Sequence, residues 1–145
     1  MISIKELDKN EVYLCFKLDL DTICLWSQEQ WESEFNKKGV KVFGLLMSEK
    51  IIGVCVVQVI IDEAQINYFS IDRKFRRRGY GCHLMKNLIN HCEVINVKKL
   101  LLEVSDTNTS AKKFYSQFKF LTVGRRKNFY KDGSDAVLKE KILIK

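Results

Sequence analysis

The chain has 145 residues, of which 46% are hydrophobic and 30% are charged, and its formal net charge at pH 7 is +7. This length suits one domain with one core, and the hydrophobic content excludes an intrinsically disordered chain. No apolar run approaches the ~18 residues that a membrane-spanning helix needs, and the N-terminus lacks the layout of a signal peptide. We therefore expect a single domain over residues 1–145, located in the cytoplasm, with no membrane partner.

Cysteine and histidine usage argues against disulfides and metal sites. The cysteines form no CxxC pair and are irregularly spaced, so we expect all five to be reduced, buried thiols. They are Cys15, Cys24, Cys55, Cys82 and Cys92. His83 and His91 would lie about 12 Å apart along a helix, too far to share a metal ion. No metal is expected.

The basic charge admits a polyanionic partner such as nucleic acid. The lysines, however, are scattered, and dense basic clusters occur only at residues 73–78 and 125–127. A local anionic ligand at the first cluster explains the charge more simply than a nucleic-acid groove. Nucleic acid is therefore not expected as a direct ligand.

The first part of the chain predicts one strand and two helices. Residues Ile2–Leu7 alternate between apolar and polar, which predicts a strand. Asn10 is the expected N-cap of a helix that ends near Asp21, and Ser27 is the expected N-cap of a second helix through Phe35.

An antiparallel meander is predicted next. The strands Val40–Met47 and 51–61 flank the turn residues 48–50, which is a hairpin pattern. A third strand, 64–71, follows after Asp62 and Glu63. Short connections between consecutive strands make an antiparallel arrangement the expected one.

The second half alternates helices with strands. The predicted elements are a helix over 79–93, a strand over 99–104, a helix over Thr109–Gln117, and strands over 120–129 and 136–144 around a turn at 131–134. A helix separates strand 64–71 from strand 99–104, so these two should pair in parallel. The expected fold class is α/β (α+β): a mixed, mostly antiparallel central sheet of about seven strands flanked by about four helices.

The run from Arg76 to Gly81, Arg-Arg-Arg-Gly-Tyr-Gly, stands between a predicted strand and a predicted helix. Backbone amides and the helix dipole at such a junction bind phosphate groups, and glycine lets the chain turn sharply. A dinucleotide fingerprint is excluded because Leu84 occupies the third glycine position, and a P-loop is excluded because no Gly-Lys-Ser/Thr follows. An arginine-rich solvated turn stays open as the alternative.

Three further candidate site residues lie later in the chain. Glu103 lies inside an apolar strand, on the face opposite Leu102, where a carboxylate is costly unless it is used or paired. An ion pair at the strand end is the alternative. Asn108 is either a ligand-binding residue or a helix N-cap, and Tyr115 is either a functional residue or a core aromatic.

The R-x-x-G-x-G pattern after an antiparallel meander resembles the acyl-CoA-binding motif of the GNAT superfamily of N-acetyltransferases. The residues around it, from Asp62 to Tyr130, are similar to the RimI-type branch, whose members acetylate the N-terminal alanine of a small-subunit ribosomal protein. The sequence departs from that branch at Lys119, where glycine is usual, at Ser105, where arginine is usual, and at Leu25 and Arg73, where proline is usual.

The resemblance implies direct acetyl transfer from acetyl-CoA to a protein N-terminus, without an acyl-enzyme. It implies that Glu103 accepts the amine proton and that Tyr115 protonates the CoA thiolate. The implied cofactor-binding residues are Phe69, Ser70, Ile71, Arg76, Arg77, Arg78, Gly79, Tyr80, Gly81, Cys82 and Asn108. The implied substrate-binding residues are Phe129 and Tyr130. A monomer or weak dimer is expected.

Three other functions stay open at this point. One is a GNAT enzyme that acts on a lysine or a small amine. A second is a non-catalytic acyl-CoA-binding module, which would not need Glu103 and Tyr115 together. A third is a nucleic-acid-binding domain that uses the basic turn.

Overall fold

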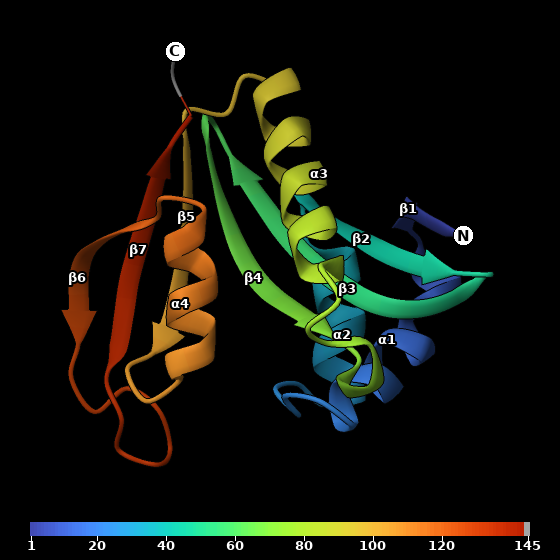
Figure 1. The fold of residues 1–145 in the computed structure, drawn as a ribbon, viewed down its shortest axis with the longest axis horizontal. Coiled ribbons are helices and arrows are strands. Elements are labelled where there is room, and N and C mark those ends of the chain that lie inside the picture. Colours follow the sequence, from blue (N-terminus) through green and yellow to red (C-terminus); the bar gives the residue numbers. More distant parts are fainter. Residues whose placement is uncertain (144–145) are drawn as a thin grey trace.

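A computed structural model describes residues 1–143 of the chain (Figure 1). The elements in chain order are β1 (Ile2–Leu7), the 3-10 turn η1 (Lys9–Glu11), α1 (Val12–Leu20), α2 (Gln28–Asn36), β2 (Val40–Met47), β3 (Lys50–Ile60), β4 (Glu63–Ile71), the 3-10 turn η2 (Arg73–Phe75), α3 (Tyr80–Val94), β5 (Lys99–Ser105), α4 (Thr109–Gln117), β6 (Leu121–Arg126) and β7 (Ala136–Ile142).

The strands form one seven-stranded sheet with the order β1-β2-β3-β4-β5-β7-β6. β4 and β5 pair in parallel, and the other neighbours are antiparallel. The predicted fold class and the predicted parallel pairing across α3 are therefore confirmed. Among residues 1–143, no helix is long and apolar enough to cross a membrane.

The helices cover both faces of the sheet. α1 and α2 lie on one face over a core that includes Trp31, Val56 and Tyr68. α3 and α4 lie on the other face over a larger core built around Leu84 and Leu100. Figure 1 shows α3 in front of the sheet with α2 behind it, and α4 in front of β5. The centre of the sheet is thus buried on both sides, which accounts for the continuous apolar runs of β2 and β3.

The centre of the sheet opens where β4 and β5 stop pairing. Their register runs only from Glu63 opposite Lys99 to Ile66 opposite Leu102, although both strands continue. Asn67 has no partner on β3, because the register steps from Tyr68 to Ile66 there. Such a bulge bends its strand and increases its twist. β4 and β5 accordingly diverge toward one end of the sheet (Figure 1).

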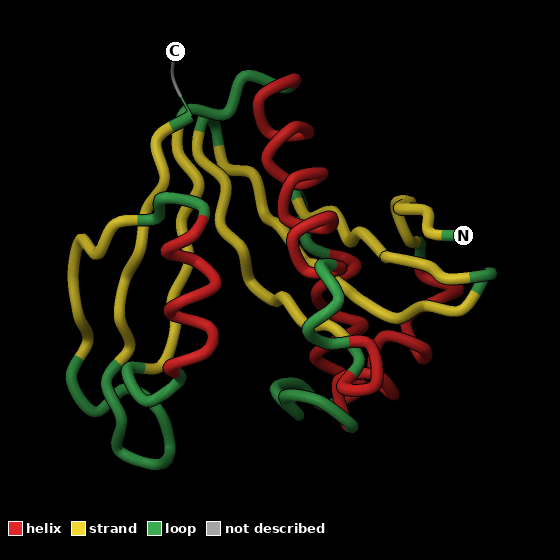
Figure 2. Tube along the Cα trace, in the orientation of Figure 1, coloured by secondary structure: helices red, strands yellow, loops and turns green. Residues whose placement is uncertain are grey.

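Four connections meet at that open end, as Figure 2 shows: α1–α2, β4–α3, β5–α4 and β6–β7. They contain the Arg/Gly turn and all three of Asn108, Phe129 and Tyr130. Loops at one end of a rigid sheet are a common place for binding residues. The fold therefore gathers most of the predicted site residues at one edge.

Several predicted boundaries are corrected. The β2–β3 turn is two residues long, because Ser48 and Glu49 both have positive φ (47° and 73°), as a type I′ hairpin turn requires, and β3 begins at Lys50. The capping side chain before α1 is Asp8, which accepts from the Asn10 amide in a capping box, so Asn10 is not the cap.

At the C-terminal end, β6 covers only Leu121–Arg126, because residues 127–129 belong to the loop. The predicted end of the last strand, Ile144, lies outside the described residues.

Candidate active site

A cavity of about 480 Å³ opens between the C-terminal end of β4, the start of α3 and the start of α4. The predicted site residues that line it are Phe69, Ser70, Ile71, Arg76, Arg77, Gly79, Gly81, Cys82, Asn108 and Tyr115. Arg78, Tyr80, Glu103, Phe129 and Tyr130 are not among its lining residues. The structure thus brings most of the implied cofactor residues together in one cavity.

The Arg/Gly turn presents free backbone amides to this cavity. The first backbone bond of α3 runs from the His83 N–H to the Gly79 carbonyl (3.1 Å). The N–H groups of Tyr80, Gly81 and Cys82 therefore have no partner inside the helix. Arg77 (φ 63°) and Gly79 (φ 84°) both adopt the left-handed conformation. This helix end suits the diphosphate of an acyl-CoA.

The two glycines of the turn serve different purposes. Gly79 has φ +84° and no atom within 4 Å of a built Cβ, so it is needed for backbone conformation. A Cβ at Gly81 would lie 3.2 Å from the Phe114 ring. Gly81 thus allows α4 to approach α3 closely. The sequence pattern assigned both glycines to a sharp turn, but at Gly81 the reason is the close neighbour Phe114.

The three arginines also differ. Arg76 donates from Nε to the Ile71 carbonyl (3.0 Å) and so closes the end of β4. Arg78 stacks on the ring of Phe75, a lining residue, at 5.7 Å but does not itself line the cavity. Arg77 lines the cavity and makes no ion pair with the described residues. Arg77 is therefore the arginine best placed to bind a phosphate.

Tyr115 lies on α4, only 9% exposed, with its ring against Phe69, Phe114 and Phe120. Burial raises the pKa of its phenol above the ordinary value. At neutral pH the hydroxyl keeps its proton and faces a cavity that it lines. Such a group can act as a general acid.

Asn108 is the N-cap of α4, and its Oδ1 accepts from the Ala111 amide (3.1 Å). The N-cap alternative is therefore present in the structure. The cap uses only the oxygen, and Asn108 also lines the cavity. The amide nitrogen remains as a donor for a ligand.

Glu103 belongs to a second cluster next to the cavity. Arg126 Nη2 lies 3.4 Å from its Oε1, and the Arg126 guanidinium is 5.5 Å from the Phe129 ring. Burial first, and then the charge of Glu103, raise the pKa of Tyr130. Tyr130 in turn contributes to the raised pKa of Tyr115. Glu103, Arg126 and Phe129 thus form a cluster of charged and aromatic side chains on β5, β6 and the β6–β7 loop.

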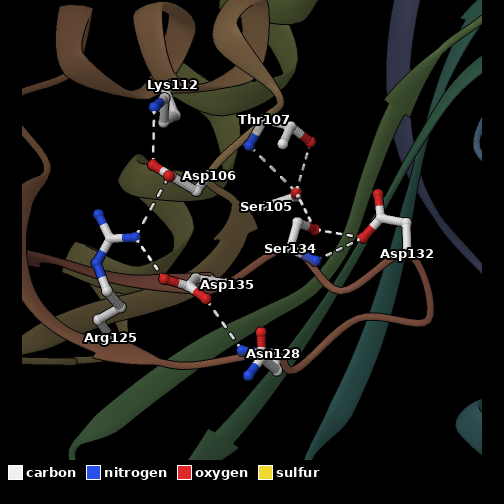
Figure 3. A network of polar contacts seen from close by, with 9 residues as sticks. All are labelled: Ser105, Asp106, Thr107, Lys112, Arg125, Asn128, Asp132, Ser134 and Asp135. Carbon is white, nitrogen blue, oxygen red and sulfur yellow. Dashed lines mark hydrogen bonds and ion pairs between the residues drawn. The ribbon is translucent and has the colours of Figure 1, made fainter.

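A polar network fixes the loop that carries Phe129 and Tyr130 (Figure 3). Arg125 Nη1 pairs with Asp135 (2.9 Å) and Asp106 (3.3 Å). Ser105 Oγ lies 2.9 Å from both Thr107 Oγ1 and Ser134 Oγ. Ser105, which replaces the usual arginine, thus ties the β5–α4 loop to the β6–β7 loop.

Sequence reasoning missed several cavity residues. They are Ile23, Phe75, Ser110, Ala111 and Phe114. Ala111 and Phe114 precede Tyr115 by four residues and one residue on α4, so helical spacing was the available signal for Ala111, and adjacency to Tyr115 for Phe114. Ile23 comes from the α1–α2 loop, and nothing in its local sequence connects it to β4.

One prediction about the thiols is wrong. Cys15, Cys55 and Cys92 are buried, but Cys24 is exposed and Cys82 is partly exposed at the cavity. Cys24 stands in a loop with φ 55°, where its side chain is turned out of the core. Among the described residues, no cluster of three or more His, Cys, Asp and Glu side chains could hold a metal ion.

Comparison with known proteins identifies the family. Residues 9–120 match the model of the Acetyltransferase (GNAT) family. This chain belongs to the GNAT acetyltransferase family. It is an acetyl-CoA-dependent N-acetyltransferase, and the cavity beside the α3 N-terminus is where its residues suit the acetyl donor.

Similar proteins of known name support membership of this family. A [ribosomal protein bS18]-alanine N-acetyltransferase of Haemophilus ducreyi is 35% identical over 103 residues, covering 68% of this chain and 71% of that protein. The Escherichia coli enzyme of the same name is 30% identical over 105 residues, covering 72% and 70%. The crystal structure of the Escherichia coli ribosomal-protein-S18-alanine N-acetyltransferase matches with a TM-score of 0.94 at 26% identity, over 100% of this chain and 96% of that one.

Proposed function

We propose that this acetyltransferase acts on the N-terminal α-amine of a protein, specifically the N-terminal alanine of a small-subunit ribosomal protein. The observation that carries the proposal is the 35% identity to the enzyme of Haemophilus ducreyi, which is named for alanine acetylation of ribosomal protein bS18. The order of the elements supports it, because Glu103 on β5 is followed directly by α4, whose Tyr115 lines the cavity.

The donor half of the site would be formed by β4 and the turn into α3. The free amides of residues 80–82 and Arg77 would hold the diphosphate, with Arg76, Arg78 and Gly79 shaping the turn. The backbone of Phe69, Ser70 and Ile71 would lie along the pantetheine arm, and Asn108 would donate to it from Nδ2. A backbone N–H of β4 would polarise the thioester carbonyl.

The acceptor half would be formed by Glu103 and the β6–β7 loop. Glu103 would accept the amine proton through a water molecule, and Phe129 and Tyr130 would hold the first residues of the peptide. The incoming ammonium would replace Arg126 as the partner of Glu103 (3.4 Å in the free protein). Tyr115 would then donate its phenolic proton to the departing thiolate sulfur.

The acidity of the amine makes this substrate suitable. An α-amine has a pKa of ~7.7–8.0, so roughly a tenth is neutral at pH 7. A lysine side chain at ~10.4 is neutral in fewer than about one molecule in a thousand. A single carboxylate can deprotonate the first amine without a strongly shifted pKa.

A peptide panel tests the acceptor. Acetyl transfer is measured to short peptides that begin with Ala, Ser, Met or Gly and to an N-blocked peptide with an internal lysine. We expect transfer to the free N-terminus, fastest with Ala, and none to the blocked peptide. Transfer only to the blocked peptide would overturn the N-terminal assignment.

The catalytic roles predict a specific kinetic pattern. Glu103→Gln and Tyr115→Phe should each lower kcat by about a hundredfold or more, while acetyl-CoA still binds. Glu140→Gln is a matched control, because Glu140 is also a strand glutamate in an ion pair, with Lys99 at 3.9 Å. Full kcat in both site variants would refute the assigned roles.

We also propose that the chain acts as one acyltransferase domain, as a monomer or weak dimer in the cytoplasm, with neither nucleic acid nor a membrane as a direct ligand. Gel filtration at several concentrations tests the oligomeric state. A stable dimer at nanomolar concentration would contradict it.

A further inference from the structure

A chain of hydrogen bonds runs from the cavity wall through β4 to α1. Ser70 Oγ donates to Tyr68 Oη (2.8 Å), Tyr68 Oη lies 3.3 Å from Thr22 Oγ1, and Thr22 Oγ1 donates to the Leu18 carbonyl (2.8 Å). Ser70 and Tyr68 are only 5% and 3% exposed. Each hydroxyl in this chain has a single proton to donate.

The last member fixes the direction of the whole chain. A backbone carbonyl can only accept, so the Thr22 hydroxyl donates its single proton to the Leu18 carbonyl. Thr22 can then only accept from Tyr68, and Tyr68 can only accept from Ser70. The proton of Ser70 therefore points inward, and its oxygen offers only lone pairs to any further partner.

A buried carboxylate reinforces this direction. Asp19 is fully buried and accepts from the amides of Leu25 (3.0 Å) and Trp26 (2.9 Å) and from Trp31 Nε1 (2.9 Å). Burial first, and then the charge of Asp19 among the smaller causes, raise the pKa of Tyr68. Tyr68 thus stays protonated and keeps a proton to donate to Thr22.

The same chain positions the α1–α2 loop against the cavity. The Thr22 carbonyl accepts from Arg73 Nη2 (3.1 Å), so Thr22 is held by β4 through its hydroxyl and by η2 through its backbone. The next residue, Ile23, lines the cavity together with Ser70. Arg73 stands where proline is usual in the RimI-type branch, and it supplies the second of these contacts.

Tyr68 and Ser70 face the α1–α2 side of the sheet. Tyr68 packs in the core under α1 and α2 with Trp31 (4.8 Å) and Trp26 (5.5 Å). Phe69, between them, packs on the opposite side against Phe114 (5.4 Å). The diphosphate turn begins on the α3–α4 side, so the Ser70 side chain lines the cavity from the other face of the sheet.

We propose that Ser70 Oγ accepts a hydrogen bond from an N–H of the amine acceptor, and that Tyr68 and Thr22 are positioning residues that hold Ser70 in this acceptor-only state. The inference rests on the proposed function only in taking the acceptor to be a peptide. The partner must be a hydrogen-bond donor, because an atom that could only accept would meet the lone pairs of Ser70, and the N–H groups of the amine acceptor are such donors.

Steady-state kinetics with an N-terminal alanine peptide tests the proposal. Ser70→Ala should raise the KM for the peptide about tenfold, the size of one lost hydrogen bond, with the KM for acetyl-CoA unchanged. Ser116→Ala is the control, because Ser116 is an exposed serine on α4. A higher KM for acetyl-CoA with an unchanged peptide KM would overturn the proposal, as would no change in either.

The positioning roles need variants that keep the fold. Thr22→Val removes the hydroxyl at constant shape and should raise the peptide KM several-fold, and Thr22→Ser should restore it. Tyr68→Phe should act in the same direction, whereas Tyr13→Phe, at an exposed α1 tyrosine, should have no effect. Equal kinetics for Thr22→Val and Thr22→Ser would refute the chain as a positioning device.

The two proposals fail in different ways. If the peptide panel shows transfer only to lysine, the N-terminal assignment is wrong, and the Ser70→Ala comparison is then made with the lysine peptide. A raised KM for that acceptor still supports Ser70, and an unchanged KM still refutes it.

Discussion

Single residues in this protein carry roles that their neighbours do not share. The three consecutive arginines illustrate this: Arg76 and Arg77 both line the cavity, but Arg76 also closes a strand end, and Arg78 stacks on Phe75. Their side chains leave the backbone in different directions because the turn changes from extended at Arg76 to left-handed at Arg77. A sequence of like residues therefore predicts the ligand class, but not which residue binds it.

Lys119 is a second case at this scale. Glycine is usual at this position in the RimI-type branch, and the structure gives the reason: Lys119 has φ 64°, a conformation in which a Cβ costs roughly 1 kcal/mol. Lys119→Gly should therefore raise the free energy of unfolding by up to about 1 kcal/mol, after the extra entropy of glycine in the unfolded chain is subtracted.

Urea denaturation checks this prediction. Lys113→Gly is the matched control, because Lys113 is an exposed lysine inside α4, where glycine should destabilise by roughly 0.5–1 kcal/mol. Equal losses of stability in the two variants would contradict the role of the left-handed conformation.

At the scale of elements, two loops act as one unit. The β5–α4 loop carries Asp106, and the β6–β7 loop carries Asp135; Arg125 pairs with both (Figure 3). The contacts between the two loops join residues that are far apart in the sequence. The aromatic residues of the loop were predictable as substrate contacts from the resemblance, but the ion pairs that hold them were not.

The aspartates of this unit predict an acid limit for loop order. Hydrogen bonds from the Asn128 amide and then Arg125 lower the pKa of Asp135, and bonds from Ser134 lower that of Asp132. A lowered folded-state pKa gives a stabilising effect that is complete above the ordinary aspartate value of ~3.9 and is lost as the pH falls below it. The loop should stay ordered down to about pH 4.

An NMR titration of the Asn128 and Ser134 amides measures this. Both signals should change with midpoints below ~3.9, and Arg125→Gln should raise the midpoint reported by Asn128. A midpoint at or above the ordinary aspartate value in the unmodified protein would contradict the prediction.

At the scale of the whole molecule, thiol reactivity reports the packing of both cores. Burial raises the pKa of Cys15 to about 12 and of Cys92 to about 11, and Cys55 is shifted in the same direction by burial. Thiolates are the reactive species, so these three should be inert in the folded protein. Only the exposed Cys24 and the partly exposed Cys82 should react quickly.

Counting modified thiols with an aromatic disulfide reagent tests this. The folded protein should give two fast thiols and the denatured protein all five. Saturating acetyl-CoA should protect Cys82, which lines the cavity, and Cys24→Ser should leave one fast thiol that acetyl-CoA protects. Rapid reaction of a third thiol would show that a core is open.

The sequence by itself determined the fold class, the identity of the acetyl donor and the family. It could do so because these depend on local features: the alternation of the strands, the apolar stripe of α3, and a strand–turn–helix junction with fixed glycine spacing. Glu103 on an otherwise apolar strand was visible for the same reason.

Only the tertiary structure decided how these residues are used. Three features each involve two separate strands or helices: the pairing of Glu103 with Arg126, the approach of Phe114 to Gly81, and the bulge at Asn67. The direction of the hydrogen-bond chain through Ser70, Tyr68 and Thr22 is set by the Leu18 carbonyl, which is far from Ser70 in the sequence. The directions of hydrogen bonds and the burial of charge depend on which distant groups meet, and local sequence patterns do not specify this.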